Sequence, residues 1–504
     1  MSTRLVAGVD CSTQSTKVLV VDVENGEIKG SGKVSHDVYR SGGASETDPE
    51  NWWAALAKAI SKTGLATKIE AISIAAQQLG VVTLDKNHKP LRRAILWDDT
   101  RSAKKAEELV SELGGPEAVT NLIGTQPLAG FTVCSWAWLK DAESKIAEKT
   151  AYIRNPHDYV TEKLTGNGVT DRGDASGTGW WSSRTNQYIK EVLDHPLVSL
   201  KQSVLPKVLE PNDPAGSLIK SAADWTGLKE GIPVACGTGD NAAAALGLAI
   251  NPGTPVISLG TSGTAFLRSK TAPRDVSGQV FAHASASGDH LPLTCTLNAT
   301  LAVDNIAKLF GIKRESVSEK TNVVMMPFLS GERLPNYPNS RGSLYGVDHS
   351  TTSGEILLAA YEGVVYSLVE SLEVLNKHSS GIPEDSPIIL VGGGAKGKIW
   401  QDTVSRLSGR NIIIPKSEEL VAYGAASQAA GVLNNENAID ISSRWNVSDG
   451  EKVYSNGKDI KSIERIREIR ELAHEINSTN IFLSLIHISE PTRRTPISYA
   501  VFCL

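Results

Sequence analysis

An acidic residue beside glycines has the clearest chemical potential in this sequence. Asp240 stands in Gly239-Asp240-Asn241, between the apolar run 234–236 and the alanine-rich run 242–245. The dipole of a following helix keeps such a carboxylate ionised, and the glycines leave room for a ligand, so we interpret Asp240 as a general base. Ordinary helix capping by Asp240 is the alternative that the sequence leaves open.

The same segment also matches a dinucleotide-binding fingerprint. Gly237-x-Gly239-x-x-Ala242 lies between an expected strand and an expected helix, so an NAD-dependent oxidoreductase is a second hypothesis. Two features oppose it. Asp240 would place a carboxylate beside the pyrophosphate, and no acidic residue occurs between Asp240 and Asp275 to bind the ribose hydroxyl about 20 residues further on.

Hydroxyl-rich turns occur at two places about half a chain apart. Asp10 follows the expected strand 5–9 and precedes Ser12-Thr13-Gln14-Ser15-Thr16, where a carboxylate can orient a magnesium-bound water near a phosphate chain. A second strand, turn and strand occupy 255–268, with Gly260-Thr261-Ser262-Gly263 as the turn. Two related domains that hold a phosphorylated ligand between them would explain this repeat. Good hairpin formers alone explain either turn by itself.

A third glycine-rich segment, 392–398, follows the expected strand 388–391. It satisfies Gly-x-x-x-x-Gly-Lys but places Ile399 where a P-loop needs a serine or threonine for magnesium. A true P-loop is therefore not expected. The glycines still allow a base or ribose to lie close to the backbone, and a tight strand-to-helix turn is the plainer alternative.

The elements that must position these residues alternate along the chain. Short β-rich runs such as 69–75 alternate with longer amphipathic stretches such as 52–62, a pattern typical of an α/β protein. Asp48 and Pro49 predict a helix start. Isoleucines and Leu472, recurring every three or four residues over 460–476, predict an amphipathic C-terminal helix.

Composition narrows the function class. The 504 residues carry 51 Lys+Arg against 56 Asp+Glu, a net charge of −5 that does not indicate a nucleic-acid partner. No apolar run is long enough to cross a bilayer. Five scattered cysteines and the absence of a signal-peptide pattern predict a cytoplasmic protein with reduced thiols. The segment 481–504 shows no sustained period, and we interpret it as a non-native tail of the kind that a translated adapter produces.

Taken together, six blocks in order resemble the carbohydrate kinase family that includes xylulokinase, glycerol kinase, gluconokinase and ribulokinase. The resemblance covers roughly 4–476. The blocks are Gly8-Val9-Asp10-Cys11-Ser12-Thr13-Gln14-Ser15-Thr16-Lys17, Trp97-Asp98-Asp99-Thr100-Arg101, Gly239-Asp240-Asn241-Ala242-Ala243, Ser258-Leu259-Gly260-Thr261-Ser262-Gly263, Phe328-Leu329-Ser330-Gly331-Glu332-Arg333 and Gly392-Gly393-Gly394-Ala395. Within the family, the segments 155–159, 170–171 and 174–178 are most similar to those of bacterial xylulokinases.

The resemblance implies an α/β fold of two actin-like ATPase (ribonuclease H-like) domains with a ligand cleft between them. It implies a sugar-binding domain over 1–249 and a nucleotide-binding domain over 250–480. Asp240 would be the catalytic base, assisted by Asp10, which would also support Mg²⁺. The remaining implied contacts are Gln78, Leu79 and Asn241 with the substrate, and Thr13, Gln14, Ser15, Lys17, Gly260, Thr261, Gly393, Gly394 and Ala395 with ATP.

One position departs from the xylulokinase pattern. The loop after the third expected strand usually reads Gln-Met-His-Gly or Gln-Gln-His-Gly in those enzymes, and its histidine meets the sugar. Here it is Gln77-Gln78-Leu79-Gly80. A leucine cannot form that hydrogen bond, so the sequence predicts weaker binding of D-xylulose or a substrate that differs at this hydroxyl.

The expected activity is ATP-dependent phosphorylation of the primary hydroxyl of a ketopentose, D-xylulose to D-xylulose 5-phosphate. Other sugar or polyol kinases of the family are alternatives, as is a non-enzymatic ATP-binding module of the actin type. The expected partner is a small-molecule sugar, with no nucleic acid or membrane. A homodimer is left open.

Overall fold

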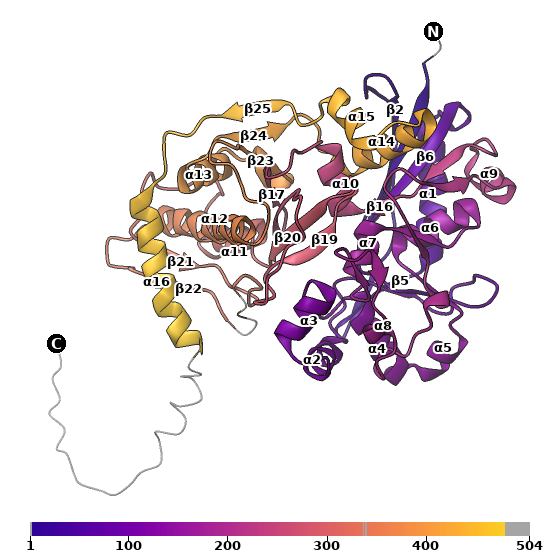
Figure 1. Ribbon diagram of the computed structural model, residues 1–504. Helices are drawn as coiled ribbons and strands as arrows, with labels where there is room; N and C mark the ends of the chain where they lie inside the picture. Colours follow the sequence, from indigo (N-terminus) through magenta and orange to yellow (C-terminus); the bar gives the residue numbers. More distant parts are fainter. Residues whose placement is uncertain (1–2, 336, 338–339, 479–504) are drawn as a thin grey trace, which may run out of the picture.

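Two mixed sheets of seven strands organise the residues that the computed structural model describes, 3–335, 337 and 340–478 (Figure 1). In the first sheet, β1 (Leu5–Cys11) pairs antiparallel with β2 (Ser15–Asp22) and parallel with β6 (Ile69–Ala76). The strand order is β14-β15-β6-β1-β2-β3, and β16 (Thr238–Gly239) pairs with the end of β6. The outer strands are β3 (Ile28–Ser35), β14 (Pro214–Ser217) and β15 (Pro233–Ala235).

The second sheet repeats the central part of the first. Strand β17 (Pro255–Leu259) pairs antiparallel with β18 (Gly263–Leu267) and parallel with β23 (Ile388–Val391). The strand order is β19-β20-β18-β17-β23-β24-β25. Its other strands are β19 (Phe281–Ala284), β20 (His290–Thr296), β24 (Ile412–Pro415) and β25 (Gly450–Val453). The two predicted hairpins are therefore equivalent centres of two sheets.

Helices cover the faces of both sheets, as the alternating pattern predicts. Helix α1 (Pro49–Thr63) packs on β2 and β3 and begins as expected, because Asp48 accepts a hydrogen bond from the backbone N–H of Glu50 (3.0 Å) and Pro49 is the first helical residue. Helices α12 (Ser353–Lys377) and α13 (Lys398–Ser408) pack together beside the second sheet. The amphipathic C-terminal helix is α16 (Ile460–Ser478).

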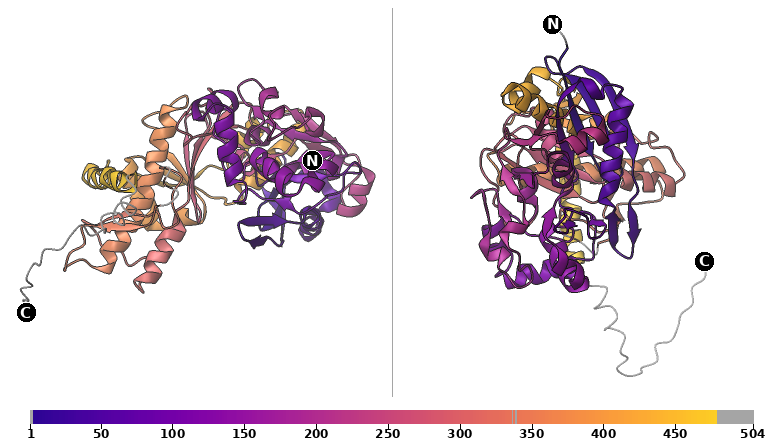
Figure 2. Two further views of the ribbon diagram at one scale, coloured as in Figure 1. Left: turned by 90° about the horizontal axis from the view of Figure 1, so that it is seen from below. Right: turned by 90° about the vertical axis from the view of Figure 1, so that its right-hand side faces the viewer.

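Two helices from the end of the sequence return to the first sheet (Figures 1 and 2). Helix α14 (Leu420–Asn434) packs on β1 and β6, and α15 (Ala438–Trp445) packs on α14. A Cβ at Gly8 of β1 would lie 1.9 Å from the carbonyl oxygen of Ala422, so only glycine permits this approach. Residues far beyond the predicted boundary at 249/250 thus form a helix that covers the first sheet.

Smaller elements surround these layers. In the first half they are β4 (Tyr39–Ser41), β5 (Ala44–Thr47), η1 (Ala66–Lys68), β7 (Val82–Leu84), β8 (Ala94–Ile95), α2 (Ala103–Glu112), α3 (Pro116–Ile123), α4 (Thr132–Ala142), α5 (Ser144–Lys149), β9 (Tyr152–Arg154), α6 (Pro156–Thr165), β10 (Val169–Asp171), α7 (Arg172–Gly177), β11 (Trp181–Ser182), β12 (Gln187–Tyr188), α8 (Lys190–Leu193), η2 (Gln202–Val204), β13 (Lys207–Leu209), α9 (Lys220–Thr226) and α10 (Asp240–Gly247). In the second half they are α11 (Thr300–Leu309), β21 (Val324–Met326), β22 (Ser343–Tyr345) and η3 (Gly393–Lys396).

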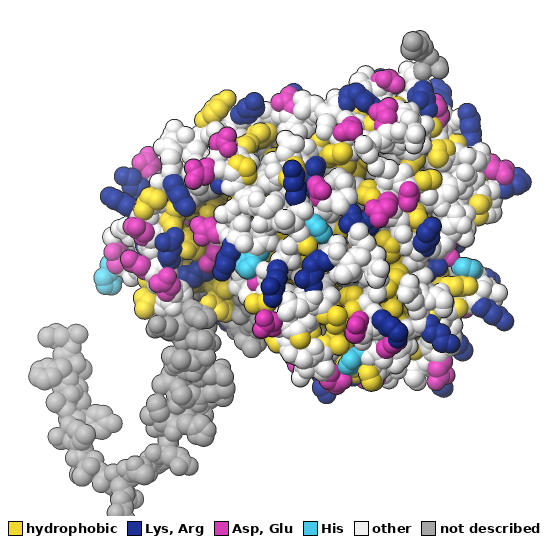
Figure 3. Space-filling model, in the orientation of Figure 1, with side chains coloured by type: hydrophobic (Ala, Val, Ile, Leu, Met, Phe, Trp, Pro, Cys, Tyr) yellow, Lys and Arg dark blue, Asp and Glu magenta, His cyan; other side chains and the backbone are white. Residues whose placement is uncertain are grey.

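Several surface and side-chain features bear on the sequence predictions. Basic and acidic side chains are interspersed on the face that Figure 3 shows. Among the helices that the structure describes, none has the length and apolar character to cross a membrane. Cys11, Cys134, Cys236 and Cys295 are free thiols. The predicted tail, 481–504, lies outside the described residues.

Candidate active site

Three strands of the first sheet end side by side and supply the polar groups of the site. Strands β1 and β16 both run parallel to β6, one on each side of it. Asp10 is opposite Ala75 in this register, and Asp240 directly follows Gly239, which is opposite Ala76. Gln78 lies just beyond the end of β6. The carboxyl ends of parallel strands are the usual place for ligands in α/β sheets, and here they bring together residues distant in sequence.

Asp240 is held by its neighbour and by the loop after β6. Its Oδ1 accepts hydrogen bonds from the backbone N–H of Asn241 (2.7 Å) and from Asn241 Nδ2 (2.9 Å). Asn241 Nδ2 also donates to Gln78 Oε1 (3.1 Å). The N-cap of α10 is Gly239, and Asp240 is the first helical residue. The sequence left open whether Asp240 caps the helix or acts as a base. Gly239 occupies the N-cap position, so Asp240 is not the cap, and its Oδ2 is available to a ligand.

Burial changes the acidity of both aspartates. Burial raises the pKa of Asp240 to about 7, where hydrogen bonds from Asn241 act in the opposite direction and the charge of Asp174 adds to the rise. Burial also raises the pKa of Asp10 to about 7, and repulsion from Asp240 contributes to that shift. A carboxylate with a pKa near the working pH is suited to accept a proton and release it again.

The environment of Asp10 fits a hard metal ion. Its Oδ1 is buried and has no hydrogen-bond partner among the described residues. Asp240 repels Asp10 electrostatically, and a divalent cation would relieve that repulsion. Carboxylate oxygens together with water and phosphate oxygens are the ligands that Mg²⁺ prefers, so these residues are compatible with the expected ion.

A cavity of about 310 Å³ lies in front of Asp240 and is lined from both halves of the chain. Of the predicted site residues, six line it: Gln78, Leu79, Asp240, Asn241, Gly260 and Thr261. Further walls are formed by Trp97, Phe131, Phe281, His283, Cys295 and Arg333, among others. The predicted substrate residues thus share one cavity with the second hydroxyl turn.

The turns of the second sheet lie next to each other. Gly260 accepts hydrogen bonds through its carbonyl oxygen from the backbone N–H (3.1 Å) and Oγ1 (2.7 Å) of Thr300, which fixes the turn after β17. A Cβ at Gly394 would lie 2.8 Å from Leu259 Cβ, so η3 packs against the residue before this turn. Gly393 is exposed, Ala395 is buried, and neither lines the cavity. The predicted nucleotide-binding glycines therefore adjoin the second turn.

The first hydroxyl turn touches the cavity indirectly. Thr13 Oγ1 accepts a hydrogen bond from Nε1 of the cavity residue Trp97 (3.1 Å). Gln14 is exposed and Ser15 half-buried. Lys17 forms an ion pair with Glu419 of the loop before α14 and lines a separate groove. A role of Lys17 in ATP binding stays a prediction, and it would require Glu419 to share or release the ammonium group.

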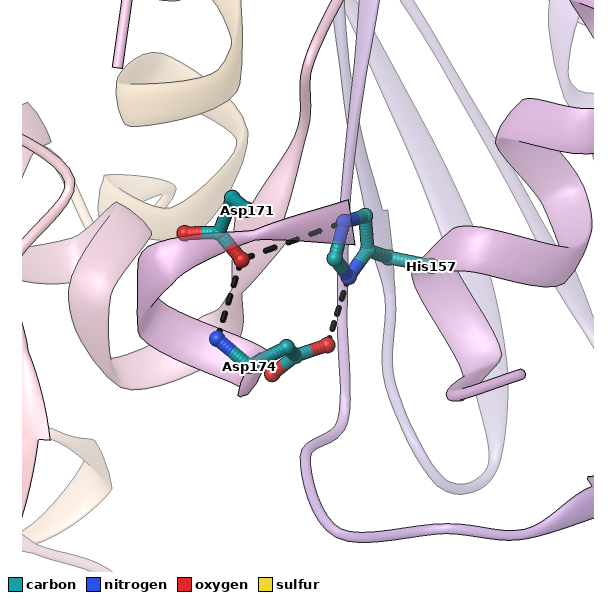
Figure 4. Close-up of side chains that lie close together, drawn as sticks. All are labelled: His157, Asp171 and Asp174. Atoms are coloured by element: carbon teal, nitrogen blue, oxygen red, sulfur yellow. Dashed lines mark hydrogen bonds and ion pairs between the residues drawn. The ribbon is translucent and has the colours of Figure 1, made fainter. Parts of the chain in front are cut away.

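The buried imidazole of His157 lies beside Asp171 and Asp174 (Figure 4). His157 Nδ1 lies 2.5 Å from Asp174 Oδ2, and Nε2 lies 3.3 Å from Asp158 Oδ1 and 3.9 Å from Asp171 Oδ1. Burial alone would lower the pKa of His157, but the surrounding carboxylates raise it well above its ordinary value, so the ring is an imidazolium. The free Oδ1 of Asp174 faces Gly239, where a Cβ would lie 2.6 Å away.

His157, Asp171 and Asp174 could in principle hold a metal ion, since their ligand atoms lie within 4.8 Å of one another. The oxygens of Asp171 are already used, because they accept hydrogen bonds from Gly173 N, Asp174 N and Thr238 Oγ1. His157 neutralises part of the acidic charge as an ion-pair partner. We therefore interpret the cluster as an electrostatic support for Gly239 and Asp240.

Sequence reasoning missed part of this site. His157 and Asp174 were noted only as members of similar segments, with no role, because nothing local indicates that they pack behind Asp240. Arg333 was noted only within a family block. His283 gave no signal beyond a histidine in an apolar run, and such a residue is usually part of the core.

The chain belongs to the FGGY family of carbohydrate kinases. The N-terminal domain of that family matches residues 5–247, and its C-terminal domain matches 256–432. Its fold is accordingly the two-domain, actin-like architecture that the sequence predicted. The resemblance stated from the six blocks is confirmed.

Relatives with similar length share this family. A xylulose kinase of Streptomyces coelicolor is 49% identical over 465 residues, covering 92% of this chain and 95% of the relative. A xylulose kinase of Streptomyces rubiginosus is 48% identical over 463 residues, with the same coverage. Among solved structures, the xylulose kinase of Bifidobacterium adolescentis superposes with a TM-score of 0.82 at 30% identity and covers 93% of this chain and 99% of that one.

Proposed function

We propose that this carbohydrate kinase transfers the γ-phosphoryl group of ATP to the primary hydroxyl of D-xylulose, giving D-xylulose 5-phosphate and ADP. The observation that carries the proposal is Asp240, a carboxylate with one available oxygen, facing a cavity that both halves of the chain line. The relatives named xylulose kinase support the choice of sugar.

In this mechanism Asp240 Oδ2 accepts the proton of the sugar's primary hydroxyl. The hydroxyl oxygen forms a bond to the γ-phosphorus while the bond from that phosphorus to the β,γ-bridging oxygen breaks, and ADP leaves. Gln78 and Asn241 hold the carboxylate in position through the hydrogen bonds described above. Phosphoryl transfer depends mainly on such positioning and on charge stabilisation.

Asp10 would hold Mg²⁺, directly or through water, and the ion when bound neutralises charge on the phosphates. The backbone and hydroxyl groups of Gly260 and Thr261 are suited to the phosphate oxygens, and Gly393, Gly394 and Ala395 to the adenosine side. We further propose Thr13, Gln14, Ser15 and Lys17 as the opposing phosphate contacts. Closure of the two halves would exclude the water that otherwise hydrolyses ATP.

ADP release coupled to a sugar panel tests the proposal. D-xylulose, D-ribulose, L-ribulose, gluconate and glycerol are each supplied with ATP and Mg²⁺, and the product is identified by phosphorus NMR. We expect the highest kcat/KM with D-xylulose and a phosphate ester on its C5 oxygen. Preference for another sugar would contradict the substrate but retain the kinase, whereas nucleotide binding without any sugar-dependent turnover would indicate a non-enzymatic module.

The cellular setting follows from the same proposal. A kinase that consumes ATP and contains free thiols is expected in the cytoplasm, in agreement with the four free cysteines. A homodimer stays a prediction, which sedimentation velocity at micromolar concentration tests.

A further inference from the structure

Strand β19 comes from the second sheet but docks on the first half of the chain. Ser176 Oγ of α7 accepts a hydrogen bond from the backbone N–H of Ala284 (2.8 Å), and Thr125 Oγ1 donates to the carbonyl oxygen of Val280 (3.3 Å). The rings of Phe131 and Phe281 lie 5.9 Å apart. These contacts hold β19 against the half that supplies Asp240.

Alternation along β19 sends two side chains to the cavity. Phe281 and His283 are two residues apart, so they share one face of the strand, and both line the cavity in front of Asp240. Ala282 and Ala284, on the other face, are buried and do not line it. The docking of β19 therefore presents an imidazole to the predicted substrate site.

The imidazole of His283 has unused hydrogen-bonding capacity. The residue is only 7% exposed, and its Nδ1 is buried with no hydrogen-bond partner among the described residues. Burial lowers the pKa of His283 to about 4, so the ring is neutral and offers one donor and one acceptor at physiological pH. His36 and His290 also have buried ring nitrogens without partners, but His283 lines the cavity in front of Asp240. Its Nδ1 lies next to Gly177, where a Cβ would be 3.3 Å away, so Nε2 is the ring nitrogen available to a ligand.

His283 lies beside the position where the sequence predicted a missing contact. A Cβ built on Gly177 would be 2.8 Å from Leu79 Cδ2 and 3.1 Å from His283 Cε1, so the two side chains converge at Gly177. Both line the same cavity. Leu79 cannot form a hydrogen bond, whereas the adjacent imidazole can.

We propose that His283 forms a hydrogen bond to a hydroxyl of the sugar beside Leu79 and thereby determines substrate specificity. This inference rests on the proposed function, because it names the residue that recognises the substrate of that reaction. The imidazole comes from the second half of the chain, so sugar recognition is shared between the two halves.

Kinetics of His283→Leu test the inference. We expect KM for D-xylulose to rise about tenfold or more, because a sugar hydroxyl loses its partner. KM for ATP is expected to stay within about twofold, since His283 lies on β19 and not on the turns proposed for the nucleotide. His283→Gln retains a donor and an acceptor, so its KM for D-xylulose is expected to lie between those of His283→Leu and the wild type. An unchanged KM for D-xylulose in a folded His283→Leu variant would overturn the inference.

A double variant tests whether the two positions act on one hydroxyl. Leu79→His places an imidazole beside the lost one, so we expect it to lower KM for D-xylulose more in the His283→Leu background than in the wild type. Equal effects in both backgrounds would show that positions 79 and 283 act independently and would overturn the shared contact.

A measurement on the wild-type protein avoids the folding of variants. With ¹⁵N-histidine labelling and no ATP, D-xylulose is expected to shift the ring nitrogen signals of His283, which are assigned by their loss in His283→Gln. Absence of a shift at a sugar concentration that saturates the enzyme would overturn the inference. Wild-type turnover of D-xylulose tests the proposed function separately, so failure of that function is distinguishable from failure of the inference.

Discussion

The two sheets have the same central pattern of strands but offer different groups at the strand ends. In the first sheet the ends of β1, β6 and β16 present Asp10, Gln78 and Asp240. In the second sheet the ends of β17 and β23 present glycines and Thr261. In the proposed mechanism one topology therefore supports two kinds of chemistry: only the first sheet supplies the proton acceptor, whereas both sheets supply phosphate contacts.

The physical requirements of the two sides explain the difference. The proposed general base must be desolvated and still ionise near neutral pH. Burial raises the pKa of Asp240 to about 7, and hydrogen bonds from Asn241 limit that rise. A polyphosphate instead needs close approach to backbone N–H groups, which small residues allow. Larger side chains at the ends of β17 and β23 would obstruct that approach, while a glycine in place of Asp240 could accept no proton.

Replacing Asp240, at the end of the first sheet, should have the largest effect on catalysis. We expect Asp240→Asn to lower kcat by about 10²-fold or more, because an amide cannot accept the proton of the attacking hydroxyl. ATP affinity, measured by calorimetry, should stay nearly unchanged, since Asp240 is not among the residues proposed to contact the nucleotide. Near-normal kcat in this variant would remove Asp240 from the mechanism.

The pH dependence of kcat/KM tests the same residue, Asp240. The active form of Asp240 is the carboxylate, and its pKa is raised to about 7, so protonation inactivates the enzyme at a higher pH than for an ordinary aspartate. We expect kcat/KM for the sugar, measured at saturating Mg²⁺ and ATP, to be level above pH 7 and to fall about tenfold per unit below it.

Asp174→Asn is the matched variant for this profile. The charge of Asp174 contributes to the raised pKa of Asp240, so its removal is expected to move the midpoint to lower pH. A flat wild-type profile between pH 5.5 and 8, or an unmoved midpoint in Asp174→Asn, would contradict this electrostatic account.

A substitution at Gly393 tests the second sheet. A Cβ there meets no atom within 4 Å, so a larger side chain can point into open space without disturbing the fold. If adenosine binds here, Gly393→Val should raise KM for ATP about tenfold, the loss caused by one steric obstruction, and leave KM for the sugar unchanged. Gly393→Ala serves as the milder variant, with a smaller rise. Equal KM values for ATP in all three proteins would place adenosine elsewhere.

The sequence predicted the parts of this molecule that depend on local pattern. Both hairpins, the start of α1 at Asp48, and the C-terminal helix follow from residue types within a few positions of one another. The family resemblance implied Asp240, Gln78 and Thr261 as site residues, and the structure places them around one cavity.

The remaining parts depend on docking between distant segments, which local pattern does not encode. His283 reaches the cavity because β19 packs on α7, and Asp174 faces Gly239 because α7 packs on β16. His157 instead lies against Gly237, where a Cβ would be 2.7 Å from its Cδ2. The crossing of α14 to the first sheet was likewise not visible, because its alanine-rich sequence fits any close helix contact. The predicted boundary at 249/250 stays a prediction about sequence units, and helix α14 packs across it.

That crossing gives the smallest expected effect, on stability and not on catalysis. A Cβ at Gly424 of α14 would lie 1.9 Å from the carbonyl oxygen of Ala243 in α10, and backbone atoms on both sides prevent adjustment. We expect Gly424→Ala to destabilise the protein by about 1 to 3 kcal/mol through overpacking, seen as a Tm lowered by a few degrees. Gly393→Ala is the control, because its Cβ meets nothing and its Tm should not change.

If Gly424→Ala melts like the wild type, α14 does not pack tightly on α10. The second half of the chain then stabilises the first half less than the packing indicates. If instead Tm falls while both KM values hold, the two halves share one folding unit although their strand ends divide the chemistry.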